Sequence, residues 1–217
     1  MKQVWQIDSE FKRLSVPLSP EEERKLENSL IRKGCMDPIA VWHGCILDGH
    51  KRYEICSYEE MDYKTVEMNF VSREDAIIWI CKKRVEESSA DKTIYKYLVG
   101  KWYNAEKTRI HAKRKEERRK SLDLAIEQKG EEGQLVSIPV NRISKVIAVQ
   151  ISMSYNSVES YGMLAKFLDE ISEKDEVFFT ALVENKIVVS FEKLRKLAQM
   201  DETKLIGIRR KLLREED

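Results

Sequence analysis

The segment from Pro17 to Cys56 constrains the fold of this chain more than any other. It opens with the run Ser19-Pro20-Glu21-Glu22, in which serine can cap a helix, proline suits the first helical turn, and glutamate can complete a capping box. Gly34 follows the apolar side of this helix and is expected to end it, because glycine readily adopts the left-handed conformation at a helix C-terminus. The segment therefore begins with a well-defined helix.

Two short apolar runs follow, at residues 39–42 and 45–47, and they are expected to form strands. His43-Gly44 lies between them and suits a hairpin turn, because the glycine can supply positive φ. The chain then passes through Asp48-Gly49-His50-Lys51-Arg52 into a helix predicted at 50–58. This order of helix, strand, turn, strand and helix is typical of a small α+β unit.

The run from Asp48 to Arg52 is a candidate anion-binding site. Gly49 lets the backbone turn sharply and approach a ligand closely, and the free N–H groups of a helix N-terminus attract anions. Arg52 can hold a phosphate group through two hydrogen bonds. Lys51 adds positive charge, and His50, as a side chain that is at best partly protonated near neutral pH, can act as a donor or acid. The same residues also fit a plain polar helix start capped by Asp48.

The rest of the N-terminal half predicts further elements of the same unit. A short strand is expected at 4–7, and another at 65–70, where apolar residues alternate. Ser72-Arg73-Glu74-Asp75 forms a second capping box, which opens a helix through about Val85. Residues 1–88 are therefore predicted to form one α+β domain.

After this domain the pattern becomes helical. Asp91 is expected to cap a long helix that runs into a charged stretch and ends near Arg119. The polar, glycine-bearing run 129–133 predicts a linker. We therefore expect a long basic helix and linker over 89–133 and a helical domain over 134–217. The predicted fold class is a small α+β domain followed by an all-α domain.

Positive charge is concentrated in the middle of the chain. The formal net charge is only +1, but residues 91–120 carry 11 basic and 4 acidic side chains. Such a segment favours contact with double-stranded DNA, whose phosphates attract Lys and Arg regardless of base sequence. A solvated charged helix would show the same pattern. The candidate DNA-contacting side chains of this segment are Lys107, Arg109, Lys113, Arg114, Lys115, Arg118, Arg119 and Lys120.

Residues 143–166 fit the pattern of a helix-turn-helix. The first helix would bury Ile147-Ala148, and Ser152 stands at the turn position where glycine is usual. The second helix would present its first turn to the major groove, where Asn156 can read adenine. An ordinary helical hairpin is the alternative, and Glu159 near the groove-facing side favours it. The candidate DNA-contacting residues of this helix start are Ser154, Tyr155, Asn156 and Ser157.

The remaining sequence carries few functional signals. A C-terminal apolar stripe suits a dimer contact; its members are Leu205, Ile208, Leu212 and Leu213. The four cysteines form no Cys-x-x-Cys pair and no metal-ligand spacing occurs, so we predict no metal site and no catalytic residue. The sequence has no run of 18 apolar residues and no apolar leader, so we expect a cytoplasmic protein without a membrane partner.

Two runs of this chain resemble the N-terminal domain of the ParB/sulfiredoxin superfamily. They are Gly34-x-x-x-Pro38-Ile39-x-Val41 and Ile46-x-Asp48-Gly49-His50-x-Arg52-Tyr53. The resemblance implies a fold in which this loop and helix bind nucleotide phosphates. Sulfiredoxins have a catalytic cysteine where this chain has His50, so sulfinic acid reductase activity is not expected. Chromosomal ParB proteins bind cytidine triphosphate here through a motif whose last arginine this chain keeps as Arg52.

A third motif of the superfamily is altered. Relatives typically show ENQLGRRN where this chain, in ungapped register, has residues 82–89. Lysines replace the acidic and amide residues expected near metal and phosphate, and Glu87-Ser88 replaces the arginine pair. Because lysine repels Mg²⁺ and carboxylate repels phosphate, this change weakens any site for CTP with Mg²⁺, the cofactor that the resemblance implies. Lys82-Lys83-Arg84 can instead hold a bare anion or the DNA backbone, or form a solvated helix face.

Together these features predict a ParB-like DNA-binding protein that acts in plasmid or mobile-element partition or in transcription regulation. It would bind palindromic DNA as a homodimer. Two alternatives stay open. One is a nucleotide-binding enzyme or switch (CTPase-like, kinase or nuclease) that uses Asp48 to Arg52, although the altered third motif argues against an enzyme. The other is an interaction protein that holds a partner with its helical half.

Overall fold

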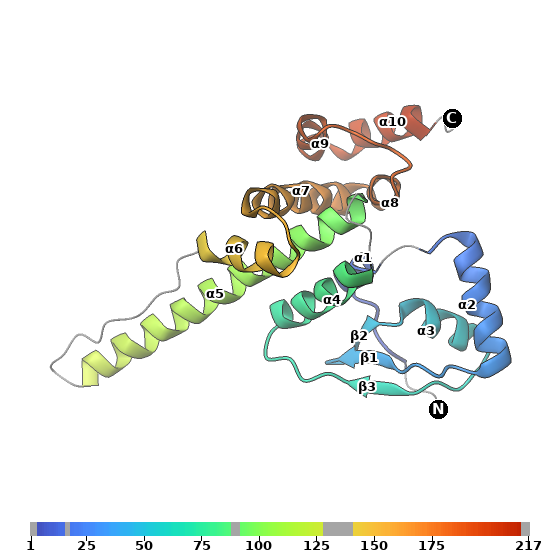
Figure 1. Cartoon of the computed structure of the whole chain (residues 1–217), viewed down its shortest axis with the longest axis horizontal. Helices are drawn as coiled ribbons and strands as arrows, with labels where there is room; N and C mark the ends of the chain where they lie inside the picture. The colour runs from blue at the N-terminus through green and yellow to red at the C-terminus, as the bar shows by residue number, and fades with distance from the viewer. Residues whose placement is uncertain (1–3, 16–17, 88–91, 128–140, 214–217) are drawn as a thin grey trace.

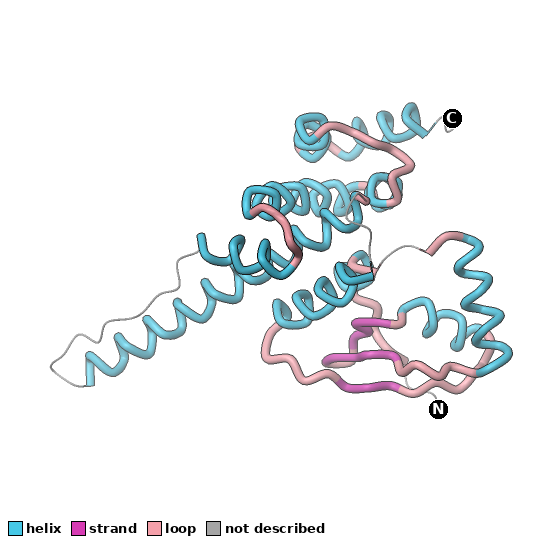
Figure 2. Tube along the Cα trace, in the orientation of Figure 1, coloured by secondary structure: helices cyan, strands magenta, loops and turns pink. Residues whose placement is uncertain are grey.

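The computed structural model describes residues 4–15, 18–87, 92–127 and 141–213, and it consists of an α+β unit followed by helices (Figures 1 and 2). The predicted fold class is confirmed in this outline. The elements of the first unit are α1 (Ser9–Arg13), α2 (Pro20–Lys33), β1 (Ile39–Trp42), β2 (Cys45–Asp48), α3 (His50–Tyr58), β3 (Thr65–Glu67) and α4 (Arg73–Glu87). The helices that follow are α5 (Thr93–Glu127), α6 (Asn141–Gln150), α7 (Tyr155–Lys174), α8 (Glu176–Val183), α9 (Phe191–Ala198) and α10 (Glu202–Leu213). The predicted cap Asp91, the linker at 129–133 and the domain boundaries after residues 88 and 133 lie outside the described residues.

A three-stranded sheet in the order β2-β1-β3 forms the base of the first unit. Strand β1 pairs antiparallel with β2 and parallel with β3, and a bulge lies between Ala40 and Val41. The turn between β1 and β2 places His43 at φ 47° and Gly44 at φ 80°. Two consecutive positive φ values are typical of a type I′ hairpin turn. The predicted hairpin is therefore confirmed.

Two strand predictions are wrong in extent. Residues 4–7 form an isolated bridge rather than a strand, because only Gln6 exchanges backbone hydrogen bonds with the β1–β2 hairpin. Strand β3 ends at Glu67 rather than near residue 70, because its partner β1 is only four residues long. At residues 65–70 the alternation of apolar residues therefore extends further than the partner strand does.

Side-chain caps determine where two helices begin. The Ser19 hydroxyl accepts a hydrogen bond from the Glu22 N–H, and the Glu22 carboxylate accepts one from the Ser19 N–H at 2.8 Å. Ser72 and Asp75 make the same exchange at the start of α4. Gly34 ends α2 with φ 75°. Both predicted capping boxes are confirmed, and both depend only on residues within one helical turn.

The hydrophobic core is continuous from the first unit into the helical half, and α5 lies at its centre, packed against α4 and α7 (Figure 1). At the α5–α7 crossing the helices touch through glycines. A Cβ on Gly100 would lie 2.0 Å from the Tyr161 carbonyl oxygen, and one on Gly162 would lie 2.6 Å from the Tyr103 ring. Only glycine permits this approach, so these two positions set the distance between α5 and α7.

A buried polar network crosses the same junction. Lys101 is only 8% exposed and donates to Glu10 at 2.5 Å and to Asp169 at 2.9 Å. Tyr97 donates to Asp169 at 2.7 Å, and Arg73 of α4 donates to Glu10 at 2.8 Å. Because buried charges are costly without partners, the network favours one arrangement of α1, α4, α5 and α7.

The structure also bears on two predictions about partners. The C-terminal stripe mainly covers the chain's own core: Leu205 is fully buried, Ile208 and Leu213 pack against the core, and Leu212 is 38% exposed. It therefore offers little apolar surface to a second copy. In the described part of the chain, every helix is too short or too polar to span a bilayer.

Candidate functional site

The predicted anion-binding step has the backbone shape expected from its sequence. Gly49 precedes α3 with φ 90° and ψ 22°, in the left-handed region, and its carbonyl accepts the hydrogen bond from the Tyr53 N–H at 2.8 Å. No side chain caps this helix start. The alternative in which Asp48 caps the helix is therefore wrong. The step is a left-handed glycine turn into the helix, and the Asp48 side chain forms ion pairs instead of a cap.

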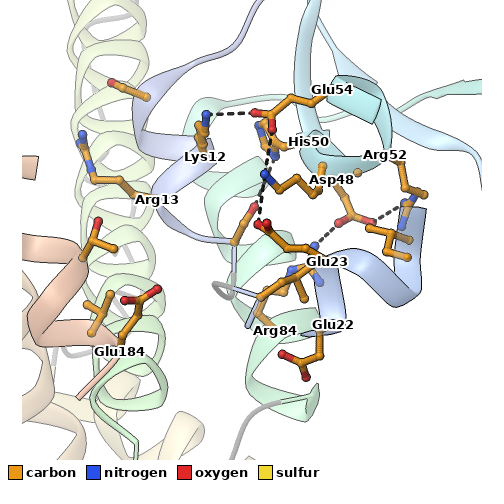
Figure 3. Close-up of a pocket in the computed structure, with 18 of the residues that line it drawn as sticks. Lys12, Arg13, Glu22, Glu23, Asp48, His50, Arg52, Glu54, Arg84 and Glu184 are labelled. Atoms are coloured by element: carbon orange, nitrogen blue, oxygen red, sulfur yellow. Dashed lines mark hydrogen bonds and ion pairs between the residues drawn. The ribbon is translucent and has the colours of Figure 1, made fainter. Parts of the chain in front are cut away.

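The Asp48 carboxylate is buried and lies among three cations (Figure 3 shows two of them). Lys83 donates to Oδ2 at 2.7 Å, Arg52 donates to the same oxygen at 3.4 Å, and Arg84 donates to Oδ1. Burial by itself would raise the pKa of the Asp48 carboxyl, but Arg84, Lys83 and Arg52 outweigh burial and hold the pKa below its ordinary value. Asp48 is therefore an ionised, internally paired carboxylate.

Arg52 and Lys51 are also engaged within the chain. The Arg52 guanidinium lies against Gly49, where an added Cβ would come within 2.9 Å of Nη2, and it donates to the Pro38 carbonyl at 3.3 Å. Lys51 pairs with Glu23 at 3.1 Å and with Glu54 at 3.3 Å. The two cations that the sequence assigned to a phosphate group thus have internal partners.

His50 is nearly as buried as Asp48. It is 5% exposed, its Nδ1 lies 3.3 Å from the Ser15 hydroxyl, and its buried Nε2 has no hydrogen-bond partner among the described residues. Burial lowers the pKa of His50 to about 4, although nearby Asp48 opposes this effect. The imidazole is therefore neutral at pH 7, which removes the partial protonation expected from the sequence.

A cavity of about 760 Å³ opens beside the step, between α2, α3 and α8 (Figure 3). Its walls carry charges of both signs. The cations are Lys12, Arg13, Lys51, Arg52 and Arg84, and the carboxylates are Glu22, Glu23, Asp48, Glu54, Glu176 and Glu184. Ion pairs join the two sets across the cavity, such as Lys12 with Glu54 at 3.1 Å and Arg13 with Glu176 at 3.6 Å. The cavity is therefore not a strongly positive site.

The residues present do not fit a nucleoside triphosphate with Mg²⁺. The cations of the step are already paired with carboxylates of the chain, and Lys83 lies against Asp48 rather than leaving space for a metal ion. In the described part of the chain, no group of three or more His, Cys, Asp or Glu side chains is placed to hold a metal. The cofactor that the resemblance implies therefore finds no complementary set of ligands here.

The altered third motif divides into two faces of α4. Lys83 and Arg84 turn inward to Asp48, which sequence alone did not reveal. Lys82 stays exposed, with its Nζ 5.0 Å from the centre of the Trp102 ring. The prediction of a solvated helix face thus holds for Lys82 and is wrong for Arg84, whereas Lys83 pairs with Asp48 and keeps 41% of its side chain exposed. Ser88 of this motif lies outside the described residues.

The second candidate site is the pair of helices α6 and α7. Four residues, 151–154, join them, and Ser152 within this turn has φ 52°. The Ser154 hydroxyl caps α7 by accepting from the Ser157 N–H at 3.1 Å. Ile147-Ala148 is buried as predicted. Serine thus adopts the left-handed conformation at the place where the pattern expects glycine.

The first turn of α7 is open to solvent. Tyr155 and Asn156 are exposed, whereas Ser157 is half-buried and its hydroxyl lies 2.9 Å from that of Ser154. The Glu159 carboxylate accepts a hydrogen bond from the buried Ser144 hydroxyl at 2.9 Å, which engages it within the helix pair. Asn156 is therefore the best-placed polar side chain for a contact outside the chain, and the two serines have a capping role.

The basic part of α5 is partly neutralised within the chain. Arg109 pairs with Asp75 and Glu106, and Arg119 and Lys120 pair with Glu116. Arg114 is half-buried, and the Lys107 ammonium lies 5.2 Å from the centre of the Tyr103 ring. The remaining cations are exposed and make no ion pair within the described part of the chain; they are Lys113, Lys115 and Arg118.

A comparison with solved structures gives a distant likeness. A structure described as the C2221 form of a Pnob8-like ParB-N domain aligns with a TM-score of 0.48 and 17% sequence identity, over 97% of this chain and 90% of that one. No family model matches the chain, and no curated protein matches it. The two candidate sites are therefore interpreted from their own geometry.

Proposed function

We propose that this chain is a DNA-binding protein that presents the start of α7 to the major groove and the exposed basic face of α5 to the phosphate backbone. The observation that carries the proposal is the turn between α6 and α7. Ser152 adopts φ 52° there, four residues join the two helices, and the first turn of α7 is exposed. A short turn before an exposed helix start supports a helix-turn-helix, in which the start of the second helix contacts bases in the major groove.

The charge around α7 supports a nucleic-acid partner. Its first turn contains no acidic residue, and Glu159 is engaged by Ser144. Arg142 and Lys145 are exposed on the adjacent α6. Lys and Arg at such positions bind phosphates, and an amide such as Asn156 can pair with adenine in the major groove.

The proposed biological role rests on the resemblance of the N-terminal motifs to the ParB/sulfiredoxin superfamily. It supports an action in plasmid or mobile-element partition or in transcription regulation. We propose that two copies bind a palindromic site, because the start of a single recognition helix contacts only a few base pairs. The altered third motif and the internally paired cations at Asp48 give no support to the nucleotide-dependent enzyme.

Fluorescence anisotropy with a random-sequence DNA duplex, repeated at several salt concentrations, tests the proposal. The logarithm of the association constant should fall linearly with the logarithm of salt concentration, with a slope of about −0.9 for each phosphate contacted. The triple variant Lys113→Ala, Lys115→Ala, Arg118→Ala should make this slope shallower by about three. The control removes three charges from exposed positions elsewhere, with Lys33→Ala, Lys64→Ala and Lys193→Ala, and should keep the slope.

DNA affinity that is absent, or that does not change with salt, would contradict the proposal. Equal slopes for the two triple variants would remove α5 from the DNA-contacting surface. Circular dichroism of both variants verifies that helix content is unchanged. A shallower dependence of affinity on salt then reports lost phosphate contacts.

A further inference from the structure

The Asp48 carboxylate occupies a position that is built like a binding site for a phosphate group. Three cations converge on it from two helices, with Arg52 on α3 and Lys83-Arg84 on α4. The left-handed turn at Gly49 brings the start of α3 next to the same point. We use the name cation seat for Arg52, Lys83 and Arg84 together.

The Asp48 carboxylate does not engage all the hydrogen-bond donors of the cation seat. The Nε–H groups of Arg52 and Arg84 are both buried and have no hydrogen-bond partner within the described residues. His50 is 5% exposed, adjoins the seat in sequence and lines the same cavity, and its Nε2 also has no partner within the described residues. Both anions pair with arginine, but a carboxylate has two acceptor oxygens, whereas a phosphate group offers three or more. The seat is therefore better matched to a phosphate group than to the anion that occupies it.

We infer that Asp48 is an internal substitute for an external anion: it fills the cation seat, so the wild-type chain does not bind a phosphate group there, and removing its charge converts the seat into a phosphate site. The carboxylate is attached to β2 and is already desolvated, with 5% of its side chain exposed. A dissolved anion would have to lose its hydration water and displace the Asp48 carboxylate. The carboxylate is held at the site by the chain, so it stays bound to the cations. This inference does not depend on DNA binding.

Two measurements with sodium pyrophosphate test the inference, each compared with sodium chloride at equal ionic strength. For the wild-type protein, calorimetry should detect no saturable binding of pyrophosphate. For Asp48→Asn, which keeps the shape of the side chain and removes its charge, calorimetry should show one saturable site. At a concentration about 100 times the dissociation constant, pyrophosphate should raise the melting temperature of this variant by about 5 °C more than chloride does.

Two control variants separate the cation seat from general effects of charge. Asp37→Asn removes one carboxylate at an exposed position and should behave like the wild type. Adding Arg84→Gln to Asp48→Asn should abolish the pyrophosphate-dependent rise. If Asp48→Asn does not fold in chloride, folding restored by pyrophosphate but not by chloride supports the inference. Saturable pyrophosphate binding by the wild-type protein that is lost in Arg84→Gln would overturn it, as would an Asp48→Asn variant that does not respond to pyrophosphate.

Discussion

The step from Asp48 to Arg52 and the outer face of α5 are both rich in cations, but the fold uses these charges differently. At the step, Lys51 and Arg52 have carboxylate partners within the chain, and α4 contributes two further cations to Asp48. On α5, Lys113 and its two exposed neighbours make no ion pair within the described residues. A basic run is thus available to a ligand only where tertiary structure brings no carboxylate to it.

The same contrast explains why the two basic segments, the step from Asp48 to Arg52 and the outer face of α5, have different roles. In the first region the buried Asp48 carboxylate needs its cation partners, because an unpaired buried charge is costly. Exposed lysines contribute little to stability but can neutralise DNA phosphates. The first region therefore has a structural role, and the second has the properties of a binding surface.

The largest expected loss of stability comes from disrupting the contact between α5 and α7, because α5 packs against both the first unit and the helical half. Gly100→Ala would place a methyl group 2.0 Å from the Tyr161 carbonyl oxygen, so α5 and α7 would have to separate. We expect the free energy of unfolding to fall by about 4 kcal/mol in urea titrations. The control is Gly207→Ala in α10, where nothing lies within 4 Å of the added Cβ, and it should be neutral or slightly stabilising. Equal stability of the two variants would show that α5 and α7 can move apart freely.

The next variant disrupts only the ion pairs around Asp48 in the first region. Arg84→Ala removes a main partner of the buried Asp48 carboxylate, and we expect the free energy of unfolding to fall by about 3 kcal/mol. Lys113→Ala, in the second region, should change it by less than about 0.5 kcal/mol. Urea unfolding followed by circular dichroism measures both. If the two substitutions cost the same, the contrast between the regions is wrong.

The pH dependence of stability tests the burial of His50 in the first region. Its pKa is about 4 in the folded protein, below its ordinary value of 6.5, so the unfolded chain binds the proton first. Stability from this group is complete above pH 6.5 and declines as pH falls toward about 4, by about 2 to 3 kcal/mol in total. Unfolding titrations between pH 7 and 4 should show that His50→Gln loses this decline, whereas His111→Gln, at an exposed position of α5, keeps it. An unchanged pH profile in His50→Gln would show that the imidazole is not held neutral.

The smallest effect is expected at the proposed recognition helix. Asn156→Ala should weaken binding to a selected, preferred duplex by about 1 kcal/mol or somewhat more and leave stability unchanged, because the side chain is exposed. Ser160→Ala, exposed one turn further along α7, is the matched control. Anisotropy with the preferred and with a random duplex measures the loss of discrimination. A variant that binds both duplexes as the wild type does would exclude base contact by Asn156.

Local features were predictable from sequence where a few neighbouring residues suffice to make them. The capping box at Ser19 and Glu22 and the hairpin at His43-Gly44 appear as expected, because each depends on contacts within a short stretch. The strand at 4–7 was wrong, because a strand needs a ladder of backbone hydrogen bonds and only Gln6 of this segment makes them with the hairpin. The partial protonation of His50 was wrong, because burial by distant elements lowers its pKa.

The sequence by itself determined the order of elements, the starts of the two capped helices and the left-handed turn at Gly49, since these follow from backbone sterics and nearest neighbours. Only the tertiary structure decided which charges meet. Asp48 and Lys83 are 35 residues apart in the chain, and they come together because β2 and α4 pack in one unit. That packing turned a predicted anion-binding step into an internally paired one, while nothing in the described fold covers the exposed cations of α5.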